Sequence, residues 1–324
     1  MEALLNDKQG RWLIPRLTAG SSTMHVAVPH GYPAYARIFH PAERDRPVHQ
    51  GAQPGQAQTS RDTMAGAGAG EFHVSSEFDV TSEQVSWSTV AEAFGTVMHP
   101  LAQFHRLIGS PPDGGHDVLD AAGWRYFEPM PGNLDAGTLA AVAGHLADHT
   151  TTPTKGVAAV WEGWGGLTSS AGSAVLAASD AAMPLRQPAD GPTSAASGYF
   201  VADGGPGSGI LPQDVVNGPV LHLSDRAYYL FSAGIQSFAG RGWPGDAPWQ
   251  DGSAFPQSPS ILWPDDHSWV LVTEIDWDST IVAGSWELIK ALVSDPSIEA
   301  LPIREGADLD WDADSENRPP DSPS

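Results

Sequence analysis

Alternation of apolar and polar side chains marks the first extended segments of the chain. In AYARIFH, residues 34–40, Tyr35, Arg37 and Phe39 alternate with the residues between them, and this period of two predicts a half-buried strand. MHVAV, residues 24–28, predicts a short strand that pairs with it as a hairpin. The continuous apolar run at residues 157–161, VAAVW, is typical of a strand covered on both faces.

Strand signals return in the last third of the chain. PVLHL (219–223) and AYYLF (227–231) predict neighbouring strands joined by a tight turn at Ser224–Asp225. WVLVTEI (269–275) predicts a further strand, and residues 298–303 predict a last extended piece.

Helical periodicity is clearest after a cap at Asn133 or Asp135, where Leu139, Val142 and Leu146 fall on one face. The positions of proline, glycine and capping residues predict three more helices. They cover residues 87–95, 100–107 and 286–295.

Glycine and proline, 35 and 28 of the 324 residues, interrupt these elements. Their concentration predicts long mobile loops over about 43–84 and 186–218, which bury too little surface to offset ordering entropy. The acidic residues 305–324 are predicted to be a disordered tail, with only the part up to Trp311 resting on the body. We therefore expect a single α+β domain over 1–304, with an antiparallel or mixed sheet and helices packed on it.

The charges are few and unbalanced, with 16 Lys and Arg against 39 Asp and Glu and a net charge of −23. Such a chain repels nucleic acid and anionic membranes and attracts a basic protein partner. It has no cysteine, which excludes disulfides and thiolate chemistry. Without a secretion-signal pattern or a run of about 20 apolar residues, we expect a cytoplasmic protein.

Five strings, taken together, resemble a family of actinobacterial hypothetical proteins with no assigned activity. They are GYPAYARIFHPA (31–42), VMHPL (97–101), HTTTP (149–153), VWEGWG (160–165) and LWPDDHSWVLVTEIDWDSTIVAGS (262–285). The resemblance covers the ordered segments and omits both long loops. It implies one domain and no particular function.

Glu274, Asp276 and Asp278 form the first candidate site. On a strand every second side chain shares a face, about 6.5–7 Å from the next, so the three carboxylates would stand in a row that favours a divalent cation. Asp266 and His267, one hairpin away, are candidate catalytic groups or further ligands. The alternative is a solvated strand end. No other cofactor is evident.

The string Trp161-Glu162-Gly-Trp164 offers a second site. A glutamate held between indoles is desolvated, which raises its pKa and suits a general acid. Trp161, Trp164, Trp263 and Trp269 also suggest a platform for a sugar or small ligand. Tryptophan is, however, most often a core residue.

His145 and His149 lie at i, i+4 with Asp148 between them, a weak likeness to the zinc helix of inverted metallopeptidases. No nucleophile elbow, phosphate loop or nucleic-acid motif is present in the sequence.

Three functions follow from these patterns. The first is a non-catalytic intracellular binding protein with an acidic surface. The second is a metal- or carboxylate-dependent hydrolase, and the third is a small-ligand or sugar-binding module built on tryptophan-rich loops.

Overall fold

A nine-stranded antiparallel sheet forms the main body of the protein in a computed structural model that describes residues 1–47, 80–110, 118–168, 209–252 and 256–319. Its path is β1-β8-β6-β9-β10-β11-β2-β12, with β7 paired to β8. The strands are β1 (Glu2–Leu4), β2 (Ala34–Phe39), β6 (Gly156–Trp161), β7 (Leu221–Leu223), β8 (Arg226–Ser232), β9 (Ile261–Pro264), β10 (Val270–Val272), β11 (Ser279–Gly284) and β12 (Ala300–Ile303).

Both faces of this sheet are covered. Helices α3 (Ala136–Asp148) and α5 (Trp286–Ser294) pack on one face, where alternate residues of β2, β6 and β8 meet them. The N-terminal residues 13–32 and the buried Ala307 and Leu309 cover the other face. Because successive side chains of a strand point to opposite faces of the sheet, each face carries its own apolar core.

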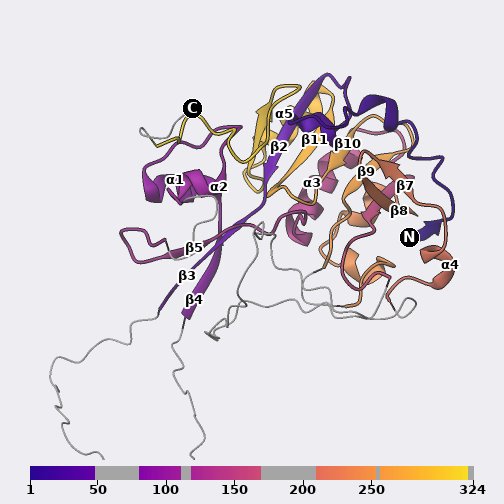
Figure 1. The fold of residues 1–324 in the computed structure, drawn as a ribbon, viewed down its shortest axis with the longest axis horizontal. Coiled ribbons are helices and arrows are strands. Elements are labelled where there is room, and N and C mark those ends of the chain that lie inside the picture. The colour runs from indigo at the N-terminus through magenta and orange to yellow at the C-terminus, as the bar shows by residue number, and fades with distance from the viewer. Residues whose placement is uncertain (48–79, 111–117, 169–208, 253–255, 320–324) are drawn as a thin grey trace, which may run out of the picture.

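A smaller unit adjoins this body (Figure 1). It holds a three-stranded antiparallel sheet in the order β4-β3-β5 and two helices, with a third apolar core around Trp87. Figure 1 shows β2 leading directly into β3, so one stretch of chain belongs to both sheets. The elements are β3 (Ala42–Pro47), β4 (Val80–Val85), β5 (Arg125–Phe127), α1 (Trp87–Phe94) and α2 (Phe104–Leu107).

The α+β class is confirmed, with antiparallel sheet as the larger part. Short helical turns complete the description: α4 (Gln213–Val216), η1 (Ile14–Arg16), η2 (Met24–Val26), η3 (Ile235–Phe238) and η4 (Trp243–Asp246). Among the described residues, no helix is long and apolar enough to cross a membrane.

Three local predictions are wrong. Residues 24–28 begin with the 3-10 turn η2 and form no strand, so β2 pairs with β11 and β12. The loop predicted over 43–84 has strands at both ends, because β3 and β4 pair with each other from Ala42↔Val85 to Pro47↔Val80. Likewise α4 lies inside the predicted loop 186–218. Residues 48–79 and 186–208 of these loops lie outside the described part.

The acidic segment 305–319 packs on the body instead of forming a disordered tail. Asp314 is fully buried. It accepts hydrogen bonds from the Gln103 backbone N–H at 3.1 Å and the Asn317 side chain at 2.8 Å, and it contacts His99 Nε2 at 2.8 Å. Together with the buried Ala307 and Leu309, these contacts offset the entropy of ordering an acidic segment. Residues 320–324 lie outside the described part.

A carboxylate that lies just before β12, far from α1 in sequence, caps α1. Glu299 accepts hydrogen bonds from the backbone N–H groups of Trp87 at 2.6 Å and Ser88 at 2.7 Å. Replacing Glu299 by alanine is expected to lower the free energy of unfolding by about 1–2 kcal/mol, because two N-terminal helix donors lose their acceptor. Urea denaturation measures this change.

The matched control is Glu287→Ala, which removes an exposed carboxylate from the first turn of α5. Its expected effect is within about 0.5 kcal/mol. Equal losses in the two variants would contradict the capping role of Glu299.

Candidate functional site

The turn between β10 and β11, residues 273–278, separates two cavities, both lined by Asp276 and Trp277. The junction cavity, of about 170 Å³, lies where the turn meets the smaller unit and the C-terminal segment. The Arg226 cavity, of about 180 Å³, lies between the turn, the β7–β8 connection and the η2 region.

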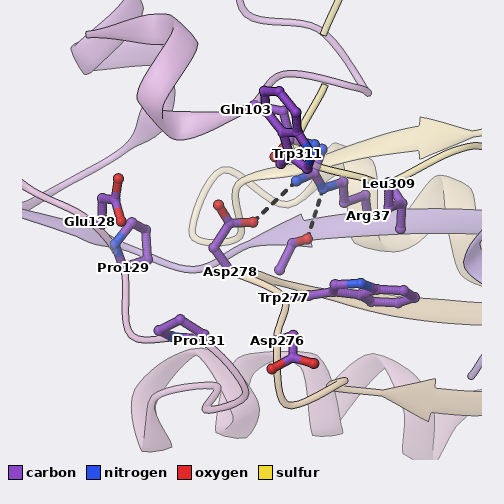
Figure 2. Close-up of a pocket in the computed structure, with 11 residues that line it drawn as sticks. Arg37, Gln103, Glu128, Pro129, Pro131, Asp276, Trp277, Asp278, Leu309 and Trp311 are labelled. Carbon is purple, nitrogen blue, oxygen red and sulfur yellow. Dashed lines mark hydrogen bonds and ion pairs between the residues drawn. The ribbon is translucent and has the colours of Figure 1, made fainter. Parts of the chain in front are cut away.

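Carboxylates and indoles dominate the junction cavity (Figure 2). Its three carboxylates are Glu128, Asp276 and Asp278, and its two indoles are Trp277 and Trp311. The exposed fraction of Trp311 is 56%, so this indole is accessible at the rim. Arg37 is the single basic residue in the lining.

Arg37 is 1% exposed and satisfied within the protein. Its guanidinium donates to Ser279 Oγ at 2.8 Å, to Asp278 Oδ1 at 3.2 Å and to two backbone carbonyl groups. It also lies 4.7 Å from the ring centre of Phe39. Burial raises the pKa of Asp278, and the charge of Arg37 opposes that rise. The guanidinium of Arg37 therefore makes its hydrogen bonds and its ion pair within the protein.

A glycine fixes the wall of the junction cavity. Gly132 has φ +68° and donates its N–H to the Trp277 carbonyl at 2.8 Å. A Cβ at this position would lie 2.6 Å from Ile275 Cα, closer than van der Waals contact permits. This close approach holds the segment carrying Glu128 against the turn.

Arg226 organises the second cavity. Its Nη2 lies 2.6 Å from Asp276 Oδ2, its Nε lies 3.3 Å from Glu274 Oε1, and its guanidinium lies 5.9 Å from the Trp161 ring centre. Burial is the largest influence on Glu274 and raises its pKa, with Arg226 acting in the opposite direction. Burial also raises the pKa of Tyr228.

The predicted row of Glu274, Asp276 and Asp278 is wrong in its geometry. Strand β10 ends at Val272, so the three residues lie in the following turn. Arg226 pairs with Glu274 and Asp276, while Arg37 pairs with Asp278. Within the described residues, the three do not gather ligand atoms around one point.

The four tryptophans predicted to form one ligand platform lie in separate parts of the structure. Trp263 and Trp269 are 2% and 1% exposed and belong to the cores on opposite faces of the sheet. Trp161 and Trp164 are only partly buried and pack edge to face with ring centres 5.6 Å apart. Glu162 is exposed, so the desolvation expected to make it a general acid is absent.

Asp266 and His267 hold a turn together. Asp266 accepts hydrogen bonds from Thr150 Oγ1 at 2.9 Å and from the Thr151 backbone N–H at 2.7 Å. Burial acts to raise the pKa of Asp266, but bonds from Thr151 and Ser268 outweigh it and lower the pKa. The His267 ring stacks on Trp12 with centres 4.0 Å apart. Neither residue lines the two cavities.

The histidine pair of α3 does not converge on a metal. His145 Nε2 lies 2.8 Å from Asp295 Oδ2, and His149 Nδ1 bonds to the His145 carbonyl at 2.8 Å. The two rings thus serve α3 and its contact with the segment after α5.

Sequence reasoning did not identify Arg37, Gln103, Glu128 and Trp311 as neighbours of the carboxylates. They come from β2, from the segments around α2 and β5, and from the C-terminal segment. A usable signal was Arg37 itself, since an arginine inside an otherwise apolar strand requires a buried acceptor.

Comparisons with models of protein families, with curated proteins and with solved structures find no match for this chain. The resemblance to the actinobacterial family therefore stays a prediction, and the functional argument depends on the geometry of the site.

Proposed function

We propose that the protein is a non-catalytic binding protein whose junction cavity accepts a cationic side chain from a basic partner. The observation that carries the proposal is the composition of the lining. It holds three carboxylates and two indoles, while Arg37 pairs with Asp278 and Arg226 pairs with Asp276 from the side of the second cavity. Carboxylates pair with a cation, and the face of an indole attracts it.

The size of the cavity supports a single inserted side chain. Small-molecule sites commonly have about 300–1,000 Å³, whereas the junction cavity has about 170 Å³. A net charge of −23 would in addition raise the association rate of a basic partner at low salt.

Fluorescence anisotropy of a dye-labelled, arginine-rich peptide tests this proposal. We expect binding that weakens with salt, and no binding of a glutamate-rich peptide. Trp311→Ala is expected to raise the Kd about 5- to 30-fold, because a cation over an indole contributes about 1–2 kcal/mol.

The control is Trp286→Ala, since Trp286 is 66% exposed on α5 and does not line the cavity. Its Kd is expected to match that of the unaltered protein. Equal weakening by the two substitutions, or equal binding of both peptides, would contradict the proposal.

A small sugar is the second candidate, because indoles beside carboxylates also suit stacking and hydrogen bonding with a polyol. Titration with a panel of neutral sugars separates the two, since sugar binding would be insensitive to salt. The metal- or carboxylate-dependent hydrolase stays a prediction: Glu162 lines neither cavity, whereas Glu274, Asp276 and Asp278 do line them and pair with Arg226 and Arg37.

A further inference from the structure

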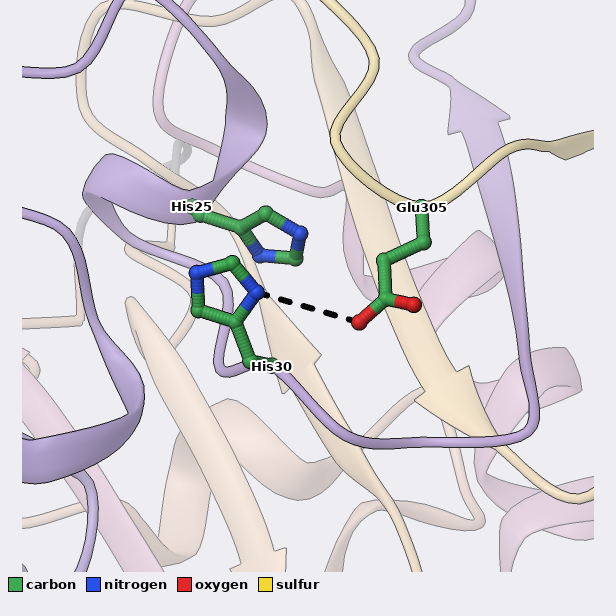
Figure 3. A group of neighbouring side chains, drawn as sticks. All are labelled: His25, His30 and Glu305. Atoms are coloured by element: carbon green, nitrogen blue, oxygen red, sulfur yellow. Dashed lines mark ion pairs between the residues drawn. The ribbon is translucent and has the colours of Figure 1, made fainter.

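Two histidines and a glutamate, far from each other in sequence, meet at the edge of the main sheet (Figure 3). His25 belongs to η2, His30 lies in the loop before β2, and Glu305 follows β12. One possible ligand atom of each residue lies within 4.8 Å of the other two. None of the three lines the junction cavity or the Arg226 cavity.

His25 brings an unsatisfied ring nitrogen to this cluster. The residue is 2% exposed, and its Nδ1 lies 2.9 Å from the Val28 carbonyl oxygen. A carbonyl only accepts, so Nδ1 carries the proton and Nε2 holds a lone pair. That Nε2 is buried without a hydrogen-bond partner among the described residues, and Figure 3 shows a nitrogen of this ring on the side of Glu305.

A buried nitrogen without a hydrogen-bond partner destabilises the fold, so a ligand at this position would remove that cost. Burial lowers the pKa of His25, the direction that favours the neutral ring. A metal ion is one partner that neutral imidazole binds well.

The other two residues are oriented by their neighbours. His30 Nε2 lies 2.9 Å from Thr18 Oγ1, which leaves Nδ1 facing Glu305 Oε1 at 3.8 Å. Glu305 Oε1 accepts hydrogen bonds from the Gly31 N–H and the Tyr35 hydroxyl, each at 3.2 Å. Metal-binding histidines commonly have this second contact on the opposite ring nitrogen, and both histidines here possess one.

We propose that His25, His30 and Glu305 bind a divalent transition-metal ion of the zinc class, with water completing the coordination. Two imidazoles and one carboxylate are a donor set for such ions, whereas Ca²⁺ and Mg²⁺ prefer oxygen alone. Ligand atoms at about 2.0–2.1 Å from a tetrahedral ion lie about 3.3 Å from each other. The His25 and His30 rings are stacked, with centres 3.4 Å apart and planes 27° apart, so the lone pairs in these planes do not converge. For an ion to bind, the exposed His30 ring must rotate out of the stack, and the His30–Glu305 separation of 3.8 Å must shorten.

The cluster is open to solvent at His30 and Glu305 and lies between two segments of the chain, which suits a structural ion. The His30 and Glu305 side chains are 44% and 50% exposed, so an ion can enter from solvent. The Met24 backbone N–H already donates to the Ala307 carbonyl at 2.8 Å beside the cluster. A bound ion would join the N-terminal cover of the sheet to the segment after β12 and stabilise both.

Titration of the EDTA-treated, dialysed full chain with Zn²⁺ and Co²⁺ tests the site. We expect one equivalent to bind, with visible Co²⁺ bands typical of nitrogen and oxygen ligands and a rise in Tm. Mg²⁺ at the same concentration is expected to leave Tm unchanged. His30→Ala and Glu305→Gln change exposed side chains that the fold tolerates, and each should raise the metal Kd at least about 100-fold.

His222→Ala is the matched control, because it removes an exposed histidine from β7. Its Kd and Co²⁺ spectrum should equal those of the unaltered chain. Failure of the unaltered chain to bind one equivalent overturns the proposal. So does equal binding by His30→Ala, Glu305→Gln and the unaltered chain, which would mean that other histidines hold the ion.

Discussion

Replacing Asp278 by alanine is expected to lower the free energy of unfolding by about 3–5 kcal/mol. The substitution leaves the guanidinium of Arg37, which is 1% exposed, without its counter-ion at 3.2 Å. The guanidinium keeps its hydrogen bonds to Ser279 Oγ and two backbone carbonyl groups, but its buried positive charge loses the opposite charge that offsets its desolvation. Urea denaturation at neutral pH measures the loss.

Two comparisons make this expectation specific. Arg37→Met combined with Asp278→Ala should be less destabilising than the sum of the single changes, because the double variant has no unpaired charge. Glu83→Ala, which breaks the exposed Arg44–Glu83 pair, should cost about 1 kcal/mol or less. Additive losses from the Arg37 and Asp278 changes would show that the two side chains act independently.

Acidification from pH 7 to pH 5 is expected to remove about 2 kcal/mol of stability through His40 alone. Burial lowers the pKa of His40 to about 4, against about 6.5 in the unfolded chain. Below pH 6.5 the unfolded chain therefore binds a proton that the folded protein does not. The contribution is present in full above pH 6.5 and is lost as pH falls toward 4.

The His40→Gln variant isolates this contribution. In the unaltered protein the ring bonds to Thr280 Oγ1 at 2.9 Å and to the Met130 carbonyl at 3.3 Å, and glutamine can offer one similar bond without titrating. Urea denaturation at both pH values should show a loss about 2 kcal/mol smaller in the variant. Equal losses in the two proteins would mean that His40 binds protons equally in the folded and unfolded states, which contradicts the expected shift.

Local sequence signals predicted the elements that short-range physics determines. The alternation in residues 34–40 corresponds to β2, although this strand is buried on both faces and not half-buried as predicted. The cap at Asp135 begins α3, and Ser285 caps α5. The same signals gave a false strand at residues 24–28, since an apolar pattern does not distinguish a strand from a covering turn. They also missed β3 and β4, whose polar residues are ordered by pairing across the unit.

The predicted row of carboxylates has the wrong geometry, because its members pair with two different arginines. Sequence periodicity treats Glu274 and Asp278 as members of one strand, yet the chain turns after Val272. Their arginine partners come from β2 and β8. Such partners follow from tertiary packing, which a single sequence does not specify.

The metal-site proposal rests on residues that no short motif joins. His25 and His30 are close in sequence, but Glu305 is 274 positions from Gly31 and still bonds to it. The pairing of β12 with β2 and the contact between Met24 and Ala307 bring them together.

The pairing of β2 also determines how late in folding this strand finds its partners. This strand lies between β11 and β12, and contacts such as His40–Thr280 span 240 positions. During synthesis, the N-terminal β2 cannot complete its pairing until the ribosome has made most of the protein. Its apolar residues stay exposed for that time, and the high contact order slows the final closure. We therefore expect chaperone dependence during biosynthesis, relieved as soon as β11 and β12 emerge.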